Sequence, residues 1–128
     1  MILYHFCPAH MVKGILREGL TKGAYPIWDG DELSLMKDTQ WLTTESNPKK
    51  QSWATSNLIE YSRTDYRLTV DIPGNYRKKV VGAYEFIKDF SEENRDPVEK
   101  YEGSDDWYIY RGKIPPKWIV GCRKLNPR

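Results

Sequence analysis

Apolar residues in the first part of the chain change their spacing twice. Residues 2–7 alternate between two faces, which predicts a short strand that Pro8 ends. From Ala9 the apolar residues recur at helical spacing, and Gly19 is the expected helix stop. Residues 21–38 are rich in Gly, Asp and Lys and predict a long loop, with one turn near its end.

This predicted loop is long enough to suggest a functional role. Loops of such length often carry binding residues, so we expect its two aromatic side chains, Tyr25 and Trp28, to contact a ligand. Residues 40–44 predict a second strand, with Asn47 and the proline after it marking the start of a helix toward Ile59.

The second half of the chain predicts more strand than helix. Residues 66–72 alternate strictly and predict a strand, and residues 83–90 have the apolar spacing of a helix. Residues 92–106 are polar, and we expect them to be irregular. Two strands follow at residues 107–110 and 118–122. Strands interrupted by helices and then following one another indicate an α+β protein, with a mixed or split sheet and helices packed on its faces.

Composition sets the class of protein. The 128 residues are 39% hydrophobic, which fits one domain over residues 1–128. Lys and Arg outnumber Asp and Glu only by 20 to 18, so no bulk charge draws the chain to nucleic acid or to a membrane. The first residues lack the basic region and long apolar stretch typical of a signal peptide, and no apolar run approaches the roughly 20 residues that span a bilayer. With two cysteines and no membrane partner, we expect a cytoplasmic protein.

Four pieces of the chain resemble one known superfamily. They are Leu3-Tyr4-His5-Phe6, Ile15-Leu16-Arg17-Glu18-Gly19-Leu20, Trp41-Leu42-Thr43-Thr44 and Gly112-Lys113-Ile114-Pro115-Pro116-Lys117-Trp118-Ile119. Their order resembles the ADP-ribosyltransferase-like superfamily, and the opening is similar to that of RNA 2′-phosphotransferases and DNA-modifying toxin transferases. The segment Ser62-Arg63-Thr64-Asp65-Tyr66-Arg67-Leu68-Thr69-Val70 also resembles small bacterial proteins with a similar opening.

The resemblance implies a fold and a ligand. The fold would be two small packed sheets with a cleft for NAD, in which His5 donates a hydrogen bond to a ribose hydroxyl. Tyr4, Thr43, Thr44 and Trp107 are the other expected contacts to NAD. Cleavage of the bond to nicotinamide develops positive charge on the sugar, so such a site has to supply negative charge and fixed hydrogen bonds.

One departure from the superfamily concerns the catalytic glutamate. Many members carry a glutamate on the strand before the Gly-x-Ile-Pro-Pro turn, and Trp107 occupies that place in this chain. Asp106 or Glu102 would substitute if the register slipped, although a slip of one residue turns a side chain to the opposite face. Asp106 is therefore the acidic candidate for catalysis.

RNA 2′-phosphotransferases offer a second catalytic scheme. They resemble this chain in their opening and use a histidine with several arginines, for which His5, Arg63 and Arg67 are the candidates. Arginine suits this role because its planar fork binds phosphate oxygens in pairs. The ordinary interpretations stay open: a histidine hydrogen-bonded at a sheet edge, and arginines in surface ion pairs.

Metal binding is the weaker chemical interpretation of the opening segment. His5, Cys7, His10 and the distant Cys122 supply four potential zinc ligands. Their spacing matches no standard zinc finger, and three ligands within six residues would crowd one ion. We therefore expect no metal.

Two functional hypotheses follow. The first is an NAD-binding enzyme that transfers ADP-ribose to a macromolecule such as nucleic acid or protein, or that handles an RNA 2′-phosphate. The second is a non-catalytic protein on the same fold that binds a nucleotide, nucleic acid or protein. His5 favours the first hypothesis, and Trp107 in place of the glutamate favours the second.

Overall fold

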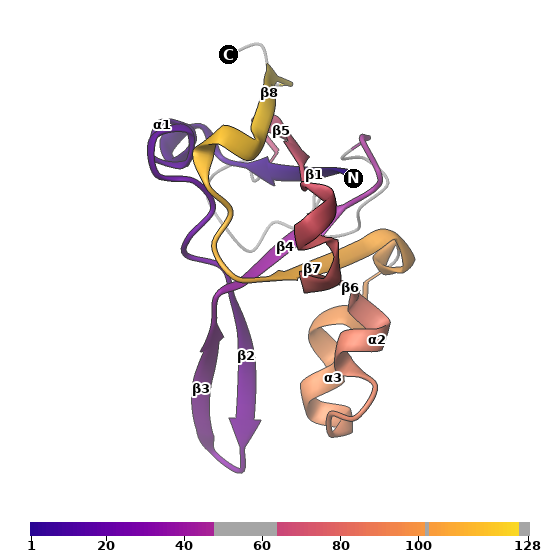
Figure 1. Ribbon diagram of the computed structural model, residues 1–128. Helices are drawn as coiled ribbons and strands as arrows, with labels where there is room; N and C mark the ends of the chain where they lie inside the picture. Colours follow the sequence, from indigo (N-terminus) through magenta and orange to yellow (C-terminus); the bar gives the residue numbers. More distant parts are fainter. Residues whose placement is uncertain (48–63, 102, 126–128) are drawn as a thin grey trace.

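A six-stranded antiparallel sheet and a separate two-stranded hairpin form the framework of the protein (Figure 1). The computed structural model describes residues 1–47, 64–101 and 103–125. The strand order of the large sheet is β6-β7-β4-β1-β5-β8. Its strands are β1 (Ile2–Cys7), β4 (Thr39–Thr43), β5 (Tyr66–Asp71), β6 (Val80–Gly82), β7 (Trp107–Arg111) and β8 (Ile119–Lys124). The predicted α+β class is confirmed, with an antiparallel sheet in the described residues.

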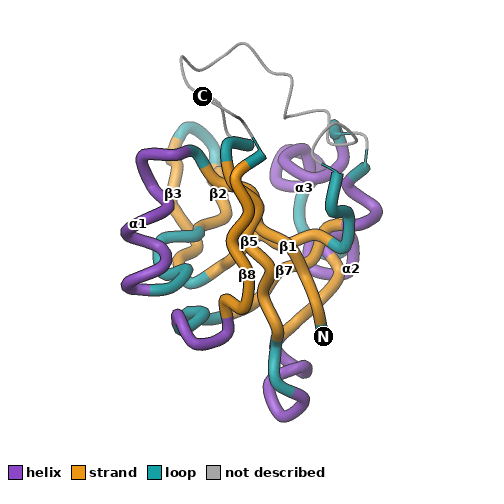
Figure 2. Tube along the Cα trace, turned by 90° about the horizontal axis from the view of Figure 1, so that it is seen from above, coloured by secondary structure: helices purple, strands orange, loops and turns teal. Residues whose placement is uncertain are grey.

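Short helices cover the two faces of the sheet (Figure 2). The α-helices are α1 (Ala9–Glu18), α2 (Ala83–Ile87) and α3 (Glu92–Glu99), and the 3-10 helices are η3 (Gly74–Lys79), η4 (Ser104–Asp106) and η5 (Pro116–Trp118). On one face α1 and η5 pack over a core of aliphatic side chains, with Trp118 of η5 among them. On the other face α2, α3 and the hairpin enclose an aromatic core around Trp107.

Helix α1 follows the sequence pattern closely. Its buried residue Val12 packs with Cys7 of β1 and Leu68 of β5, as the helical spacing of its apolar residues requires. Gly19 ends the helix at φ 87°, a left-handed conformation that glycine adopts at low cost. The predicted strand before α1 and the predicted helix stop are both confirmed.

The hairpin corrects the prediction of a long loop at residues 21–38. Strands β2 (Ala24–Asp29) and β3 (Glu32–Lys37) pair through a two-residue turn that begins at Gly30, at φ 62°. The prediction failed because Gly, Asp and Lys dominate the composition of residues 21–38, and the alternation in β3 runs only from Glu32 to Leu35 before Met36 interrupts it. Contacts with residues distant in sequence stabilise the hairpin: the ring of Tyr25 packs against Phe86 and Phe90.

Residues 92–106 correct a second prediction of irregular structure. They form α3 and η4, although Pro97 lies inside α3. The helix is polar on its exposed side and buries only Asn94 and Val98, so its sequence gives almost no apolar period. Packing of Val98 against the aromatic core that includes Tyr25 of the hairpin stabilises the helix in place of an apolar face of its own.

The remaining elements lie close to where the pattern placed them. The strands at residues 40–44, 66–72, 107–110 and 118–122 are confirmed as β4, β5, β7 and β8 with small shifts of their ends. The helix expected at residues 83–90 is the shorter α2. The helix expected from Asn47 toward Ile59 lies outside the described residues. Among the described helices, none has the length and apolar character needed to cross a membrane.

Candidate functional site

The large sheet is nearly divided between β1 and β4. Six residue pairs join β1 to β5 and five join β4 to β7, but Tyr4 opposite Thr43 is the one pair in register between β1 and β4. Beyond this pair the two strands diverge. A cavity of about 920 Å³ opens at the divergence, and we call it the cleft. This volume lies at the large end of the range for ligand pockets, roughly 300–1,000 Å³.

The cleft passes from one face of the sheet to the other. His5 and Cys7 line it on the face covered by α1, together with Gly14 of that helix. Tyr4 and Trp107 line it on the opposite face. The end of α3 and the segment between α1 and β2 close its sides. A ligand in the cleft would therefore contact strand edges, ring faces and a helix at once.

His5 bridges the two diverging strands. Its Nδ1 lies 2.9 Å from the backbone oxygen of Trp41 on β4. A carbonyl oxygen only accepts, so Nδ1 carries the proton and donates it. Burial lowers the pKa of His5 below its ordinary value of 6.5, against the opposing effect of the Trp41 carbonyl. The imidazole is thus neutral at pH 7, and Nε2 is left as an acceptor on the wall of the cleft.

Two tryptophans form the aromatic wall of the cleft. The indoles of Trp41 and Trp107 meet edge to face, with ring centroids 5.8 Å apart. Trp41 stacks on Tyr25 at 5.4 Å, and its Nε1 donates to the Ala24 oxygen at 3.0 Å. Trp107 also contacts the ring of Tyr101 at 5.7 Å. These contacts hold the indoles rigid, which suits them to stacking against a flat ligand.

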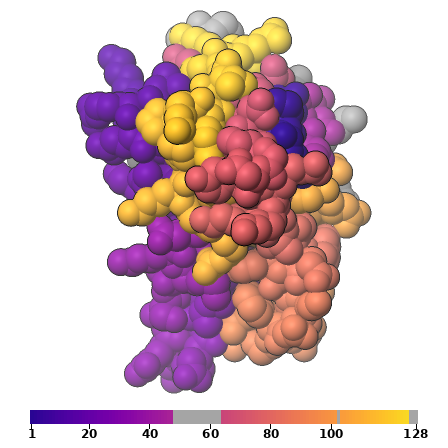
Figure 3. Space-filling model, viewed as in Figure 1, coloured from indigo at the N-terminus to yellow at the C-terminus, as the bar shows by residue number. Residues whose placement is uncertain are grey.

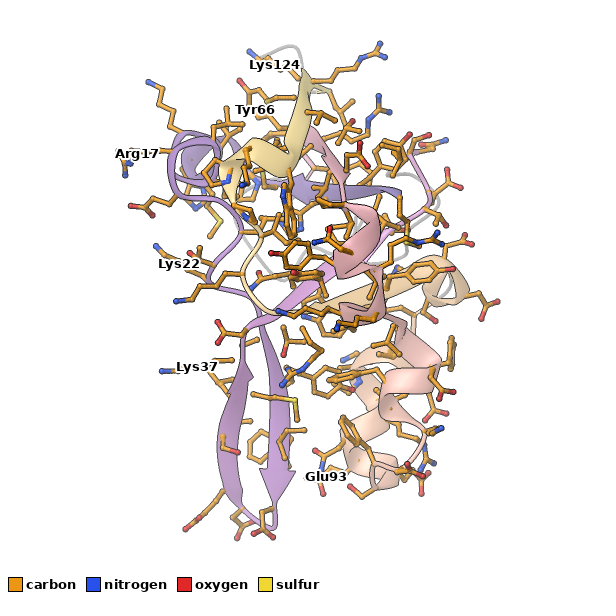
Figure 4. The ribbon with its side chains drawn as sticks, viewed as in Figure 1. Arg17, Lys22, Lys37, Tyr66, Glu93 and Lys124 are labelled. Atoms are coloured by element: carbon orange, nitrogen blue, oxygen red, sulfur yellow. The ribbon has the colours of Figure 1, made fainter. Side chains whose placement is uncertain are left out.

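Charged side chains surround the cleft unevenly. Lys22 and Lys100 line it. Figure 4 shows Lys22 on the segment between α1 and the hairpin. Among the described lining residues, Glu18 is the one carboxylate, and its Oε1 lies 3.5 Å from Arg17 on the exposed end of α1. The excess of positive charge favours an anionic ligand.

Four of the predicted site residues meet in the cleft. Tyr4, His5, Thr43 and Trp107 all line it, although Trp107 lies on a strand far from the other three in sequence. The hydroxyl of Thr43 accepts a hydrogen bond from the Glu45 backbone at 3.0 Å, which fixes its orientation. These four lining residues were thus predicted from the sequence, and they lie on both faces of the sheet.

Other predicted residues lie elsewhere. Arg67 is not among the lining residues, because its guanidinium sits over the Tyr4 ring at 5.3 Å and donates to the Ser46 oxygen at 3.1 Å. Asp106 is exposed on η4 and contributes its backbone oxygen to Thr44, which is also exposed and outside the cleft. Arg63 lies outside the described residues.

Comparison with known proteins identifies no relative of this chain: no protein-family model, no curated protein and no solved structure matches it. The resemblance to ADP-ribosyltransferase-like proteins is therefore a hypothesis, and function has to be inferred from the residues that line the cleft.

Tyr25 and Trp28, the two aromatic residues expected to contact a ligand, both lie outside the cleft. Tyr25 is fully buried in the aromatic core, where its hydroxyl donates to the Asn94 oxygen at 2.5 Å, so it does not reach a ligand. Trp28 is exposed at the far end of β2 and does not line the cleft. The loop interpretation failed because paired strands direct alternate side chains to opposite faces.

The thiols and imidazoles do not assemble a metal site in the described residues. No group of three or more His, Cys, Asp or Glu side chains there is close enough to hold an ion. Burial raises the pKa of the Cys7 thiol to about 11, with smaller contributions from Cys122 and Asp65. Cys7 is thus a protonated, buried wall of the cleft at pH 7.

Several lining residues had no clear signal in the sequence. Gln40 is buried, and its amide links the Gly23 nitrogen to the Gly112 oxygen, each at 3.0 Å. Lys22 and Lys100 lie in separate polar segments, so only the fold brings them together. Glu18 is different, because it belongs to the Glu-Gly-Leu sequence at the end of the first helix, and that position was a usable signal.

Proposed function

We propose that the protein binds NAD in the cleft and acts as an ADP-ribosyltransferase-like enzyme on a macromolecular acceptor, with nucleic acid as one candidate. The observation that carries this proposal is the neutral His5 at the point where β1 and β4 separate. Its Nδ1–H is already used by Trp41, so its Nε2 is suited to accept a hydrogen bond from a ribose hydroxyl. This reverses the direction expected from the family resemblance.

The remaining lining supports a dinucleotide rather than a small apolar ligand. The rigid indoles of Trp41 and Trp107 offer ring surfaces to a base or to nicotinamide. Lys22 and Lys100 supply positive charge for a pyrophosphate. A cavity of about 920 Å³ is large enough to hold an aromatic ring and a pyrophosphate at the same time.

Transfer would need negative charge near the sugar. Glu18 is the carboxylate that lines the cleft, so it is our candidate for stabilising the cation that forms as nicotinamide leaves. The acceptor would supply the nucleophile, which bonds to the anomeric carbon as the bond to nicotinamide breaks and then loses its proton to solvent or to a base. Asp106 does not line the cleft, so it is not preferred for this role.

Binding is tested by titrating NAD into the protein while tryptophan fluorescence is followed, since two of its indoles line the cleft. His5→Asn keeps a donor for the Trp41 oxygen but loses the acceptor Nε2. We expect this variant to bind NAD roughly tenfold more weakly, as fits the loss of one hydrogen bond worth ~1.4 kcal/mol. The control is Asn75→Ala, an exposed position on η3, which should bind normally. Equal affinity of His5→Asn and the unchanged protein would contradict the proposal.

Catalysis is tested separately by nicotinamide release in the presence of single-stranded DNA, RNA or protein acceptors. We expect release that depends on an acceptor, and a loss of about tenfold or more in Glu18→Gln with NAD affinity kept. Binding without release would leave the second candidate function, a non-catalytic nucleotide-binding protein. The exposed position of Asp106 and the presence of Trp107 at the expected glutamate position favour that candidate.

A further inference from the structure

Strand β3 forms the outer edge of the hairpin. Strand β2 lies between β3 and α3, and the hairpin extends away from the large sheet (Figure 1). Trp28 is opposite Leu33, and Pro26 is opposite Leu35. Strand β3 pairs with β2 on one edge and is not part of the large sheet. The other edge of β3 therefore has no strand partner in the described part of the chain.

Asn94 shows which backbone groups point outward. The Trp28 N–H donates to Asn94 Oδ1 at 2.8 Å, and Asn94 Nδ2 donates to the Trp28 oxygen at 3.0 Å. The backbone groups of Trp28 therefore point away from β3. Opposite residues of an antiparallel pair share this geometry, so those of Leu33 point away from β2.

Leu35 has the same outward geometry as Leu33. Its partner Pro26 has no N–H to offer, which is acceptable only at a position where the two strands do not hydrogen-bond. Within the described residues we find no hydrogen-bond partner for the outward groups of Leu33 or Leu35. The edge of β3 thus presents two N–H and two C=O groups in a row.

The side chains beside this edge are apolar and exposed. Leu33 is 50% exposed, Leu35 57% and Trp28 41%. They lie on the face of the hairpin opposite Tyr25, Ile27 and Met36, which pack into the aromatic core. In Figure 3 the hairpin, in purple, has no other element over its left side.

The edges of the large sheet are protected from strand addition, whereas β3 is not. Strand β6 has only three residues. Strand β8 is irregular where it pairs with β5 near Val70, and it ends in Arg123 and Lys124. Short length, irregularity and basic side chains are the usual protections of an edge. Strand β3 has six residues and regular pairing, and its charged residues Glu32 and Lys37 lie only at its two ends, with the leucines between them.

We propose that β3 pairs antiparallel with β3 of a second copy of this chain, centred on Ser34, to give a four-stranded sheet across a homodimer. This register places Leu33 opposite Leu35 of the other copy, twice, with their outward N–H and C=O groups facing each other. It also places Asp31 opposite Lys37 of the other copy. Figure 4 shows Lys37 extending outward on the β3 side, where such a pairing would need it.

The self-complementarity of the edge identifies the partner. Antiparallel pairing about a two-fold axis brings together residues whose numbers have a constant sum. Here that rule matches Leu33 with Leu35 and Asp31 with Lys37, and it places Glu32 opposite Met36. Trp28 and Pro26 extend the apolar strip of each copy on the same face of the shared sheet. Edge strands with these features are templates for pairing.

The test is the molar mass in solution, measured by sedimentation equilibrium and light scattering up to millimolar concentration. We expect twice the 15.1 kDa of the chain for the unchanged protein. Leu35→Lys should give the mass of one chain, because two lysines would enter the apolar centre of the interface. The matched control is Leu16→Lys, at a leucine on α1 that is 43% exposed, and it should leave the dimer intact.

A charge exchange tests the register independently of folding defects at Leu35. Asp31→Lys should weaken the dimer about tenfold through the two symmetric pairs with Lys37. The double variant Asp31→Lys with Lys37→Asp should restore it. A single-chain mass for the unchanged protein at every concentration would overturn the proposal, as would a dimer unaffected by Leu35→Lys. A dimer that the double variant does not restore would overturn the register.

Discussion

His5 shows how one side chain connects a local pattern to the function of the cleft. The alternation of residues 2–7 placed it on a face together with Cys7, and in the structure both line the cleft. Its partner, the Trp41 oxygen, lies 36 residues away and had no signal in the sequence. Thus the residue was predictable, but its tautomer and the direction of its hydrogen bonds were not.

Burial of His5 predicts a pH dependence of stability. Its pKa is lowered in the folded protein from the ordinary value of 6.5. At pH 7.5 the imidazole is neutral in both the folded and the unfolded protein. As the pH falls through 6.5, His5 becomes protonated in the unfolded chain but stays neutral in the folded protein, where its pKa is lower. Stability contributed by neutral His5 is therefore lost as the pH falls below 6.5. In urea unfolding, we expect the unchanged protein to lose more stability between pH 7.5 and 5 than His5→Asn does. Equal losses would contradict this assignment.

Cys7 and Cys122 should differ in reactivity. Cys7 is 1% exposed and burial raises its pKa to about 11, so only about one thiol in a thousand is ionised at pH 8. Cys122 is exposed on β8. With a thiol-reactive dye at pH 8, Cys122→Ser should remove nearly all fast labelling, and Cys7→Ser should remove almost none. Fast labelling of Cys7 would show that the cleft admits reagents far more freely than the structure indicates.

Helices and strands with a strong apolar periodicity could be located from the sequence, and those with a weak periodicity could not. Strand β5 and helix α1 bury one clear face, so the pattern located them. Helix α3 and the hairpin are held by tertiary contacts between them, namely the Asn94 hydrogen bonds to Trp28 and the burial of Tyr25. Such contacts join residues about 70 positions apart and leave little trace in local sequence.

The end of α1 offers a test at this scale. A Cβ on Gly19, at φ 87°, would lie 2.0 Å from the Ile114 oxygen, whereas a Cβ on Gly30, at φ 62°, would meet nothing within 4 Å. We expect Gly19→Ala to lower the free energy of unfolding by about 3 kcal/mol or more, and Gly30→Ala by about 1 kcal/mol. Denaturant unfolding of both variants measures the difference. Similar losses would mean that the chain after α1 does not approach Ile114 as closely as described.

The whole molecule depends on how the sheet divides. Residues from both ends of the chain meet beside β5, and the single register pair between β1 and β4 leaves the space that becomes the cleft. No local pattern encodes this divergence, because each strand is regular on its own. The sequence therefore predicted the class of fold and four lining residues, while the positions of Lys22 and Lys100 beside the cleft required the assembled structure.

The most direct test of the proposed site is the nitrogen NMR spectrum of the two histidine rings, with His10 assigned from a His10→Gln variant. At pH 7 the account predicts that His5 carries its proton on Nδ1 and that Nε2 is unprotonated. Addition of NAD should shift the Nε2 resonance as it accepts a hydrogen bond. A proton on Nε2 in the free protein, or a His5 spectrum unchanged at saturating NAD, would contradict the account.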